Sequence, residues 1–455
     1  MLIPVLLFSC LTAFAAPPQP EVMDVFGYFR KADSWTVASD KFVMSNRKYG
    51  FQYLDAERTM VFSPENGRMS FGTFYVFETR VYWSDKAIRR VEVSIYNKGD
   101  AARPLDKQGF ETLVNDLNKY LTAQFGKPAK NDESKPAPKK VVREVIWNKA
   151  SPLVLLEWAF VEEHTDKTSS FRIPYTPEYA RVVMVPKTGK TAVDNANLTG
   201  QSILVKAKSL RQLKANIVRN SKGDVMLENI PMVDQGQKGY CAASSAERVL
   251  RYYGLDIDQH QVAQLAETSA RAGTGIDGFS EAITIIGKNY SLDSKALISA
   301  DSGKNFLHSQ TFEDLKDYNA AAKRAGKPQI NWKSYAKGNL IMLPDIWNAM
   351  DPEILLQSRL KNTKDFNRFL ADVKTHIDQG IPLFWSTLVG MYPEVPDIST
   401  NGKYFGHMRL IIGYNQKTGM IIYSDSWGVN HAVKHMPEQQ AWAMTKGLII
   451  LKPRL

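Results

Sequence analysis

Two hydrophobic patterns alternate along this chain of 455 residues. Apolar residues that recur every three or four positions predict amphipathic helices. The predicted helices are 106–125, 241–253, 258–270, 279–288, 312–325 and 366–378. Shorter runs, rich in β-branched and aromatic residues, predict strands. The predicted strands are 79–83, 90–96, 141–147, 153–160, 180–185, 381–388, 408–414, 420–424 and 448–451.

The order of these elements predicts two domains of the α+β class. Residues 17–186 combine strands with one long helix, and a loop rich in Pro and Lys is expected at 127–140. Residues 187–225 are polar and lysine-rich, as in a linker. In residues 226–455 the helices come first and an antiparallel sheet follows. Within this second domain, residues 290–363 are polar and irregular apart from one helix, which predicts an insertion.

The N-terminal residues 1–16 have the pattern of a secretory signal peptide. An apolar run precedes Ala13-Phe14-Ala15, a cleavage site of the A-x-A type, although the usual positive charge is missing. A short buried strand is the alternative. Cys10 follows Leu7-Phe8-Ser9 as in a bacterial lipoprotein box, a lesser alternative. No later run reaches about 18 apolar residues, so we expect a secreted, periplasmic or cell-surface protein without a transmembrane helix.

Charge and cysteine content narrow the classes of partner and site. The net charge of +11 favours anionic surfaces such as cell wall or anionic lipid. The sequence has no glycine-aromatic RNA-binding signature, so specific nucleic-acid binding is not expected. Removal of a leader that contains Cys10 leaves Cys241 as the one thiol, which excludes a disulfide framework and a multi-cysteine zinc site. His431 and His435 have a metal-like spacing without a partner cysteine, and we expect neither a metal nor a cofactor.

Cys241 carries the strongest candidate chemistry in the sequence. It opens a predicted helix, where unpaired N–H groups and the helix dipole favour a thiolate over a thiol. Gln235 lies six positions earlier, and its amide could join the Cys241 N–H in an oxyanion hole. The alternative is structural, because free cysteines are among the most buried residues.

A cysteine nucleophile needs a base, and the base needs a group that orients it. His407 stands at the start of a predicted strand, directly after Gly406. Asp425 follows the returning strand, so the hairpin would bring it close to His407. Taken singly, His407 could be a strand-edge histidine and Asp425 a turn residue. Together with Gln235 and Cys241, they favour a catalytic triad.

These residues resemble those of the papain-like cysteine peptidases. Gln235-Gly236 before Cys241, then Gly406-His407, then Ser424-Asp425-Ser426-Trp427-Gly428, are similar to the C39-like group, relatives of the bacteriocin-leader peptidases. The resemblance covers about residues 226–455 and implies a papain-like fold, with a helical half that carries the Cys and a sheet that carries His and Asp. It implies that Gln235 forms the oxyanion hole, Cys241 attacks, His407 is the base and Asp425 orients it. Ala242-Ala243 depart from the residues usual after the Cys in both groups.

The function expected from the sequence is hydrolysis of peptide bonds in a peptide or protein substrate. Transglutaminases and cell-wall amidases use the same order of Cys, His and Asp, so acyl transfer of that kind is an alternative. A catalytically inactive binding module is a further alternative. The N-terminal domain is expected to recruit substrate or anchor the protein, rather than to act as a propeptide that is removed near 187–225.

Overall fold

The computed structural model describes residues 21–454 with short gaps. The gaps are 55–57, 64–66, 85, 102, 138–139, 150, 166–171, 189, 191–206, 236–238, 256, 258, 267, 269–272, 300–305, 338–339, 399 and 401. The predicted signal peptide 1–16, with Cys10, lies outside the described residues. Among the described helices, none combines the length and the apolar composition that a membrane span requires.

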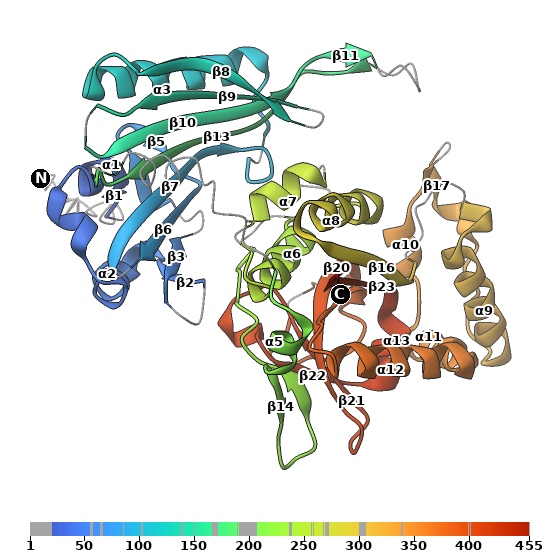
Figure 1. Ribbon diagram of the computed structural model, residues 1–455. Coiled ribbons are helices and arrows are strands. Elements are labelled where there is room, and N and C mark those ends of the chain that lie inside the picture. Colours follow the sequence, from blue (N-terminus) through green and yellow to red (C-terminus); the bar gives the residue numbers. More distant parts are fainter. Residues whose placement is uncertain are drawn as a thin grey trace, which may run out of the picture.

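The N-terminal part is built on an antiparallel sheet of eight strands (Figure 1). Across the sheet the order is β2 (Gln52–Tyr53), β3 (Met60–Ser63), β6 (Glu78–Ser84), β7 (Ala87–Asn97), β13 (Thr176–Val185), β10 (Leu153–Val161), β9 (Lys140–Trp147) and β8 (Lys130–Ala137). Helices α1 (Val25–Phe29), α2 (Ser39–Asn46) and α3 (Lys107–Phe125) accompany it. The smaller strands are β1 (Met23–Asp24), β4 (Met69–Phe71), β5 (Phe74–Tyr75), β11 (His164–Thr165) and β12 (Arg172–Ile173).

The two faces of this sheet differ in polarity. One face packs on α1 and α3 in a core that contains Phe29, Val91, Leu117 and Leu156. The side chain of Asp106 caps α3 by accepting a hydrogen bond from the Gly109 N–H, as its sequence predicts. The other face carries alternate charged residues, because successive side chains of a strand point to opposite sides. These residues include Glu78, Arg80, Glu92, Glu157 and Arg181.

The C-terminal part has a second sheet between two layers of helices. Its strand order is β14 (Ile217–Arg219), β15 (Val225–Leu227), β20 (Phe405–Asn415), β19 (Leu383–Val389), β23 (Thr445–Pro453) and β16 (Leu292–Ile298), while β21 (Met420–Ser424) extends from β20 to β22 (Lys434–Pro437). The helices are α5 (Leu210–Lys214), α6 (Cys241–Tyr252), α7 (Gln259–Leu265), α8 (Ile276–Tyr290), α9 (Gln310–Arg324), α10 (Leu343–Asn348), α11 (Pro352–Leu360), α12 (Thr363–Ile377) and α13 (Glu438–Met444). A small hairpin joins β17 (Ala336–Lys337) to β18 (Leu340–Ile341).

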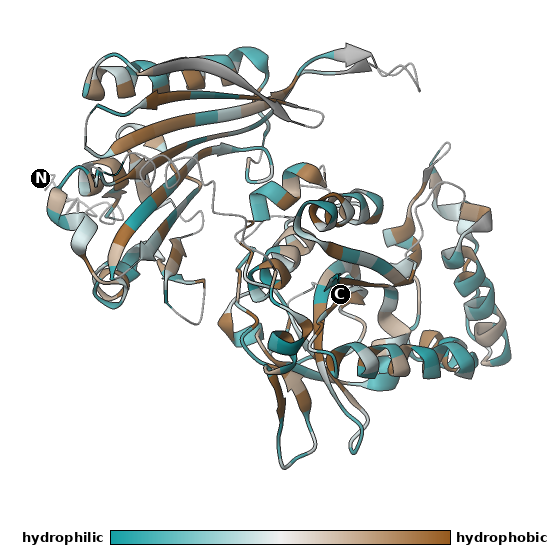
Figure 2. Ribbon diagram, viewed as in Figure 1, coloured by the Kyte–Doolittle hydropathy of each residue, from teal (hydrophilic) through white to brown (hydrophobic). Residues whose placement is uncertain are grey.

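Neighbouring residues of the central strands enter different cores. On β19, Phe384 packs with α6 and α8, whereas Trp385 packs with α12 and α13 on the other face. The inner strands are therefore buried on both sides, which explains their nearly continuous apolar sequence. In Figure 2 the outer helices α9 and α11 alternate between teal and brown, as expected for helices half in solvent.

The strands and helices expected from the sequence occur in the structure, with several differences. The expected loop at 127–140 contains the edge strand β8, whose pairing with β9 outweighs its polar composition. Residues 290–363 are more regular than expected, since they contain β16 and the helices α10 and α11. The expected helix 258–270 ends at Leu265. The strands of the expected antiparallel sheet do not pair in chain order, because α13 returns the chain so that β23 pairs with β19 and β16.

Buried polar contacts join the two parts beside α6. Arg80 of β6 forms two hydrogen bonds with the Glu247 carboxylate, at 2.8 and 3.2 Å. The Tyr240 hydroxyl donates to the Asn97 side chain at 2.8 Å. A side chain at Gly99 would overlap the Tyr240 ring, so a glycine is required there. The residue before Cys241 is therefore anchored in the N-terminal part.

The Arg80→Met substitution tests the strength of this junction. Arg80 and Glu247 are only 2% and 0% exposed, so the loss of Arg80 leaves a buried carboxylate with less compensation. We expect the free energy of unfolding to fall by about 3 kcal/mol, measured by urea denaturation. The control is Arg58→Met, whose ion pair with Asp40 is mostly in solvent and should contribute little. Equal free energies of unfolding in the two variants would contradict a contribution of the buried pair to stability.

Candidate active site

Cys241 is the first residue of helix α6 and lines an open cavity of about 340 Å³. Its side chain is only partly buried. The helix begins in a regular way, since the Ser244 N–H donates to the Tyr240 carbonyl at 2.8 Å. A thiol in this position lies at the positive end of the helix dipole and can be reached from the cavity.

His407 lies on the neighbouring strand β20, opposite Thr387 of β19. Helix α6 packs against this strand, and the Ser245 hydroxyl donates to the Met408 carbonyl at 3.4 Å. The Trp427 ring stacks on the imidazole, with 4.1 Å between centroids and 15° between planes. This contact fixes the plane of the His407 ring beside Cys241.

Asp425 approaches the edge of the same imidazole. Its Oδ1 atom lies 3.4 Å from His407 Nε2, and both side chains are buried. This contact uses Nε2 of the imidazole, which also interacts with the Cys241 thiol. Ser424, the residue before Asp425, pairs with Leu410 across the hairpin, which brings the acid near His407 as the sequence predicts.

The charges of the site favour a thiolate and an imidazolium. Burial raises the pKa of Cys241, but the hydrogen bond and charge of His407, with backbone hydrogen bonds from Met408 and Ala242, outweigh it and lower the pKa. Burial lowers the pKa of His407, but Asp425 and Cys241 together raise it. These shifts favour a thiolate–imidazolium pair over a wider pH range than the ordinary pKa values of the two groups would allow.

Burial also acts on the Asp425 carboxyl, but charge decides its state. Burial raises its pKa, whereas the Arg409 charge and the nearby His407 and His431 side chains hold the pKa well below its usual range. Lys434 Nζ lies 3.3 Å from Oδ2 of the same group. Asp425 is therefore ionised at any pH near neutrality.

Arg248 joins the helix of the thiol to the turn of the acid. Its Nη1 donates to the Asp425 carbonyl at 2.9 Å and its Nη2 to the Ser424 hydroxyl at 2.5 Å. Burial lowers the pKa of Arg248 to about 10, still far above neutrality. Two turns after Cys241 on α6, this cation holds the two sides of the site at a fixed separation.

Gln235 lies next to the Asp425 turn. Its backbone N–H donates to the Ser426 carbonyl at 2.9 Å, and its side-chain oxygen accepts from the Ser426 hydroxyl at 2.7 Å. In this arrangement the oxygen of the Gln235 amide, not its nitrogen, faces Ser426. Residues 236–238, between Gln235 and the α6 region, lie outside the described residues.

The described walls of the cavity all come from the C-terminal part. Helix α8 and strand β20 supply part of the lining, and helices α9 and α10 supply another part. The lining includes Ile276, Phe279, Gln310, Asp314, Leu343, Trp347, Leu388, Met408 and Lys446. Trp347 lies about a van der Waals contact from the position that a side chain at Gly406 would take. The cavity therefore offers both apolar and charged surface to a bound chain.

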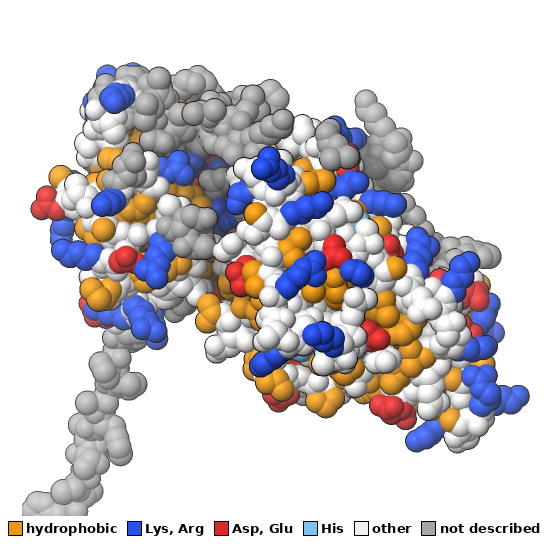
Figure 3. Space-filling model, turned by 60° about the horizontal axis from the view of Figure 1, so that its bottom comes forward, with side chains coloured by type: hydrophobic (Ala, Val, Ile, Leu, Met, Phe, Trp, Pro, Cys, Tyr) orange, Lys and Arg blue, Asp and Glu red, His pale blue; other side chains and the backbone are white. Residues whose placement is uncertain are grey.

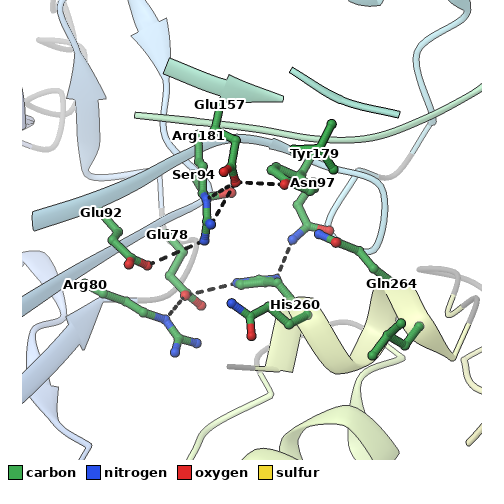
Figure 4. Close-up of a pocket in the computed structure, with 13 residues that line it drawn as sticks. Glu78, Arg80, Glu92, Ser94, Asn97, Glu157, Tyr179, Arg181, His260 and Gln264 are labelled. Atoms are coloured by element: carbon green, nitrogen blue, oxygen red, sulfur yellow. Dashed lines mark hydrogen bonds and ion pairs between the residues drawn. The ribbon is translucent and has the colours of Figure 1, made fainter. Parts of the chain in front are cut away.

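A second cavity, of about 330 Å³, lies between the two parts (Figure 4). Helix α7 faces the polar side of the N-terminal sheet there. Its charged groups pair with one another: Arg181 contacts Glu157 at 2.8 Å, and His260 Nε2 lies 3.0 Å from Glu78. Its described lining contains no cysteine, so the candidate chemistry belongs to the cavity with Cys241 and His407.

Several residues around the site were not singled out by the sequence analysis. Arg409 lies two positions after His407 and therefore on the same face of β20. A charged residue within an otherwise apolar strand is the sequence signal that could have identified it. Trp427 was noticed only as part of a motif. Glu394, Arg248 and Lys434 carried no local signal, because distant parts of the chain bring them to the site.

Comparison with known proteins agrees with this geometry. A search of curated proteins finds no match to the chain. Within the residues that the structure describes, no group of His, Cys, Asp and Glu side chains is arranged to hold a metal ion. The model of the Peptidase_C39 like family matches residues 227–450, the span that contains Gln235, Cys241, His407 and Asp425. The C-terminal part of this chain therefore belongs to the C39-like family of cysteine peptidases.

Proposed function

We propose that the protein is a secreted cysteine peptidase that hydrolyses peptide bonds. The observation that carries this proposal is the meeting of Cys241 and His407 at the wall of one open cavity, with the buried Asp425 carboxylate 3.4 Å from His407 Nε2. The family match supports a cysteine peptidase, and the apolar leader at residues 1–16 supports export. The position of the thiol on a helix and of the histidine on an antiparallel sheet supports a papain-like arrangement.

The proposed reaction is acyl transfer to water. The Cys241 thiolate attacks the peptide carbonyl carbon, and the oxygen takes up negative charge. The Cys241 N–H and the Gln235 amide stabilise that oxygen. The C–N bond breaks as the His407 imidazolium gives its proton to the leaving amine, which leaves a thioester. Water then attacks the thioester, His407 takes its proton, and the acid and the free thiolate are released.

The thiolate gives the first prediction from this mechanism. Cys241 in a Cys10→Ser protein should react with iodoacetamide at pH about 6, where an ordinary thiol with a pKa near 8.5 reacts slowly. His407→Ala should lose this reactivity, because the hydrogen bond and charge of His407 lower the thiol pKa. The labelling rate is followed by intact mass. Slow labelling that is equal in both proteins would favour the inactive binding module.

Peptide hydrolysis gives the second prediction, measured on a library of peptides by mass spectrometry. Cys241→Ala and His407→Ala should lose nearly all cleavage. Gln235→Ala should lose about 10²–10³-fold in kcat, the usual effect of one oxyanion donor. Asp425→Asn should lose less than either Cys241→Ala or His407→Ala, because Trp427 also orients the imidazole.

Added amines and wall fragments separate hydrolysis from the related reactions. A thioester can be attacked by an amine as well as by water, so the cleavage assay includes a primary amine and peptidoglycan fragments. Free acid as the main product supports the peptidase. A new amide to the added amine would instead indicate a transglutaminase, and cleavage confined to wall fragments would indicate an amidase.

The N-terminal part is proposed to anchor the enzyme or to recruit its substrate. The described residues that line the active-site cavity lie between 241 and 446, so the N-terminal part does not supply its walls. The net charge of +11 favours an anionic wall or membrane surface as a partner. In Figure 3, Lys and Arg side chains are scattered over the visible face with acidic groups between them. A diffuse surface attraction fits this distribution better than one specific acidic ligand.

This role predicts that the mature active enzyme keeps its N-terminal part. Buried contacts such as Arg80–Glu247 and Tyr240–Asn97 join that part to the helix of the thiol. Intact mass of the protein recovered by an active-site label should therefore include residues 21–186. Recovery of an active species that begins near 187–225, with no associated N-terminal fragment, would indicate a propeptide.

A further inference from the structure

Asp425 has a cationic neighbour that is nearer than the proposed catalytic base. Its Oδ1 atom lies 2.7 Å from Arg409 Nε but 3.4 Å from His407 Nε2. Its Oδ2 atom lies 3.3 Å from Lys434 Nζ and 3.8 Å from His431 Nδ1. Most of the negative charge of Asp425 is therefore balanced by groups other than the imidazole.

Arg409 and Lys434 also hold a second carboxylate, that of Glu394. Arg409 Nη2 donates to both Glu394 oxygens at 2.9 Å, and Lys434 Nζ donates to one of them at 2.7 Å. The Tyr423 hydroxyl adds a hydrogen bond at 2.6 Å. Glu394, Arg409, Asp425 and Lys434, here called the charge cluster, have side chains at most 1% exposed. Two carboxylates and two cations make the cluster neutral.

The charge cluster joins the strands around His407 and Asp425, whereas Cys241 lies on α6. Arg409 is on β20 two residues after His407, Lys434 is on β22, and Glu394 is on the segment that follows β19. Aromatic rings surround the cations, and the Arg409 guanidinium lies 4.9 Å from the Tyr423 ring centroid. The cluster thus has one rigid arrangement, fixed by strands and ring faces rather than by solvent.

A cluster of this kind is not explained well by stability. Removal of four charges from water is costly, and apolar residues of similar volume often serve a core equally well. Its contact with Asp425 gives it a different use. We propose that Glu394, Arg409 and Lys434 are positioning residues: they fix Asp425 and share its charge, so that Asp425 orients His407 more than it stabilises the imidazolium. This inference rests on the proposed thiol chemistry.

The net charge of the cluster can be changed without alteration of the triad. Glu394→Gln makes the cluster positive, which disfavours the nearby imidazolium and should make His407 lose its proton at lower pH. Lys434→Met makes the cluster negative and should have the opposite effect. The double variant is neutral again, so its His407 should titrate as in the wild type.

The experiment measures the rate at which iodoacetate alkylates Cys241, as a function of pH, in the full-length protein with Cys10→Ser. The anionic reagent needs the thiolate and is attracted by the imidazolium, so the rate should rise and then fall with pH. The falling limb reports loss of the His407 proton. We expect it to move by roughly one pH unit downward in Glu394→Gln and upward in Lys434→Met, and to return in the double variant.

Controls separate this effect from general disturbance of the protein. Glu157→Gln removes a buried carboxylate that pairs with Arg181 in the N-terminal part, and it should leave the limb unchanged. His431→Gln excludes titration of the other histidine near Asp425. If Glu394→Gln and Lys434→Met do not fold, Lys434→Arg and Lys434→Gln replace them. Of these two, only Lys434→Gln should move the falling limb.

The outcomes distinguish this inference from the proposed function. A falling limb that no folded variant of the charge cluster moves would overturn the inference alone and reduce the cluster to a structural role. A wild-type rate that only rises with pH, as for an ordinary thiol, would contradict the Cys241–His407 pair and both proposals. Opposite shifts in the single variants, with return in the double variant, would establish the positioning role.

Discussion

The structure depends on two buried charges that stand next to each other on helix α6. Glu247 pairs with Arg80 of the N-terminal sheet, and Arg248 donates to the carbonyl of Asp425, the residue that follows strand β21. Both side chains are almost completely buried, so neither contact can be exchanged for water without a large cost. The helix that presents Cys241 is therefore fixed on one side to the N-terminal part and on another to the turn that holds the acid.

This arrangement places the candidate nucleophile, the Cys241 thiol, at the wall of an open cavity. The helix supplies unpaired N–H groups at Cys241, while β20 brings His407 beside it. Trp427 covers one face of the imidazole and Asp425 its edge. The reacting atoms can meet a substrate from the cavity, whereas the groups that orient them are buried. Electrostatic interactions are stronger in the buried environment than in solvent.

The charge cluster gives the candidate acid Asp425 more charged neighbours than the acid of a simple triad has. In a triad of isolated side chains, the carboxylate both orients the base and balances its charge. Here Arg409 is nearer to Asp425 than His407 is, and Glu394 balances the cations in turn. As we propose, Asp425 then acts on His407 mainly by orientation, because Arg409 and Lys434 share its charge.

The sequence by itself determined the features that short-range rules govern. Apolar periodicity predicted helix α6 with Cys241 at its start. A capping residue predicted the start of α3 at Asp106, and a turn predicted the hairpin that brings Asp425 near His407. Each of these features depends on residues within a few positions or on one turn. The alternation of side chains along β20 also places Arg409 on the face of His407. Its partner Glu394, and Lys434 beside it, are brought there only by the tertiary structure. Tertiary structure decided those contacts, the route of β23, the edge strand β8 and the junction at Arg80. Each joins residues far apart in the chain, and the free energy of such pairings comes from burial and charge that no local pattern records.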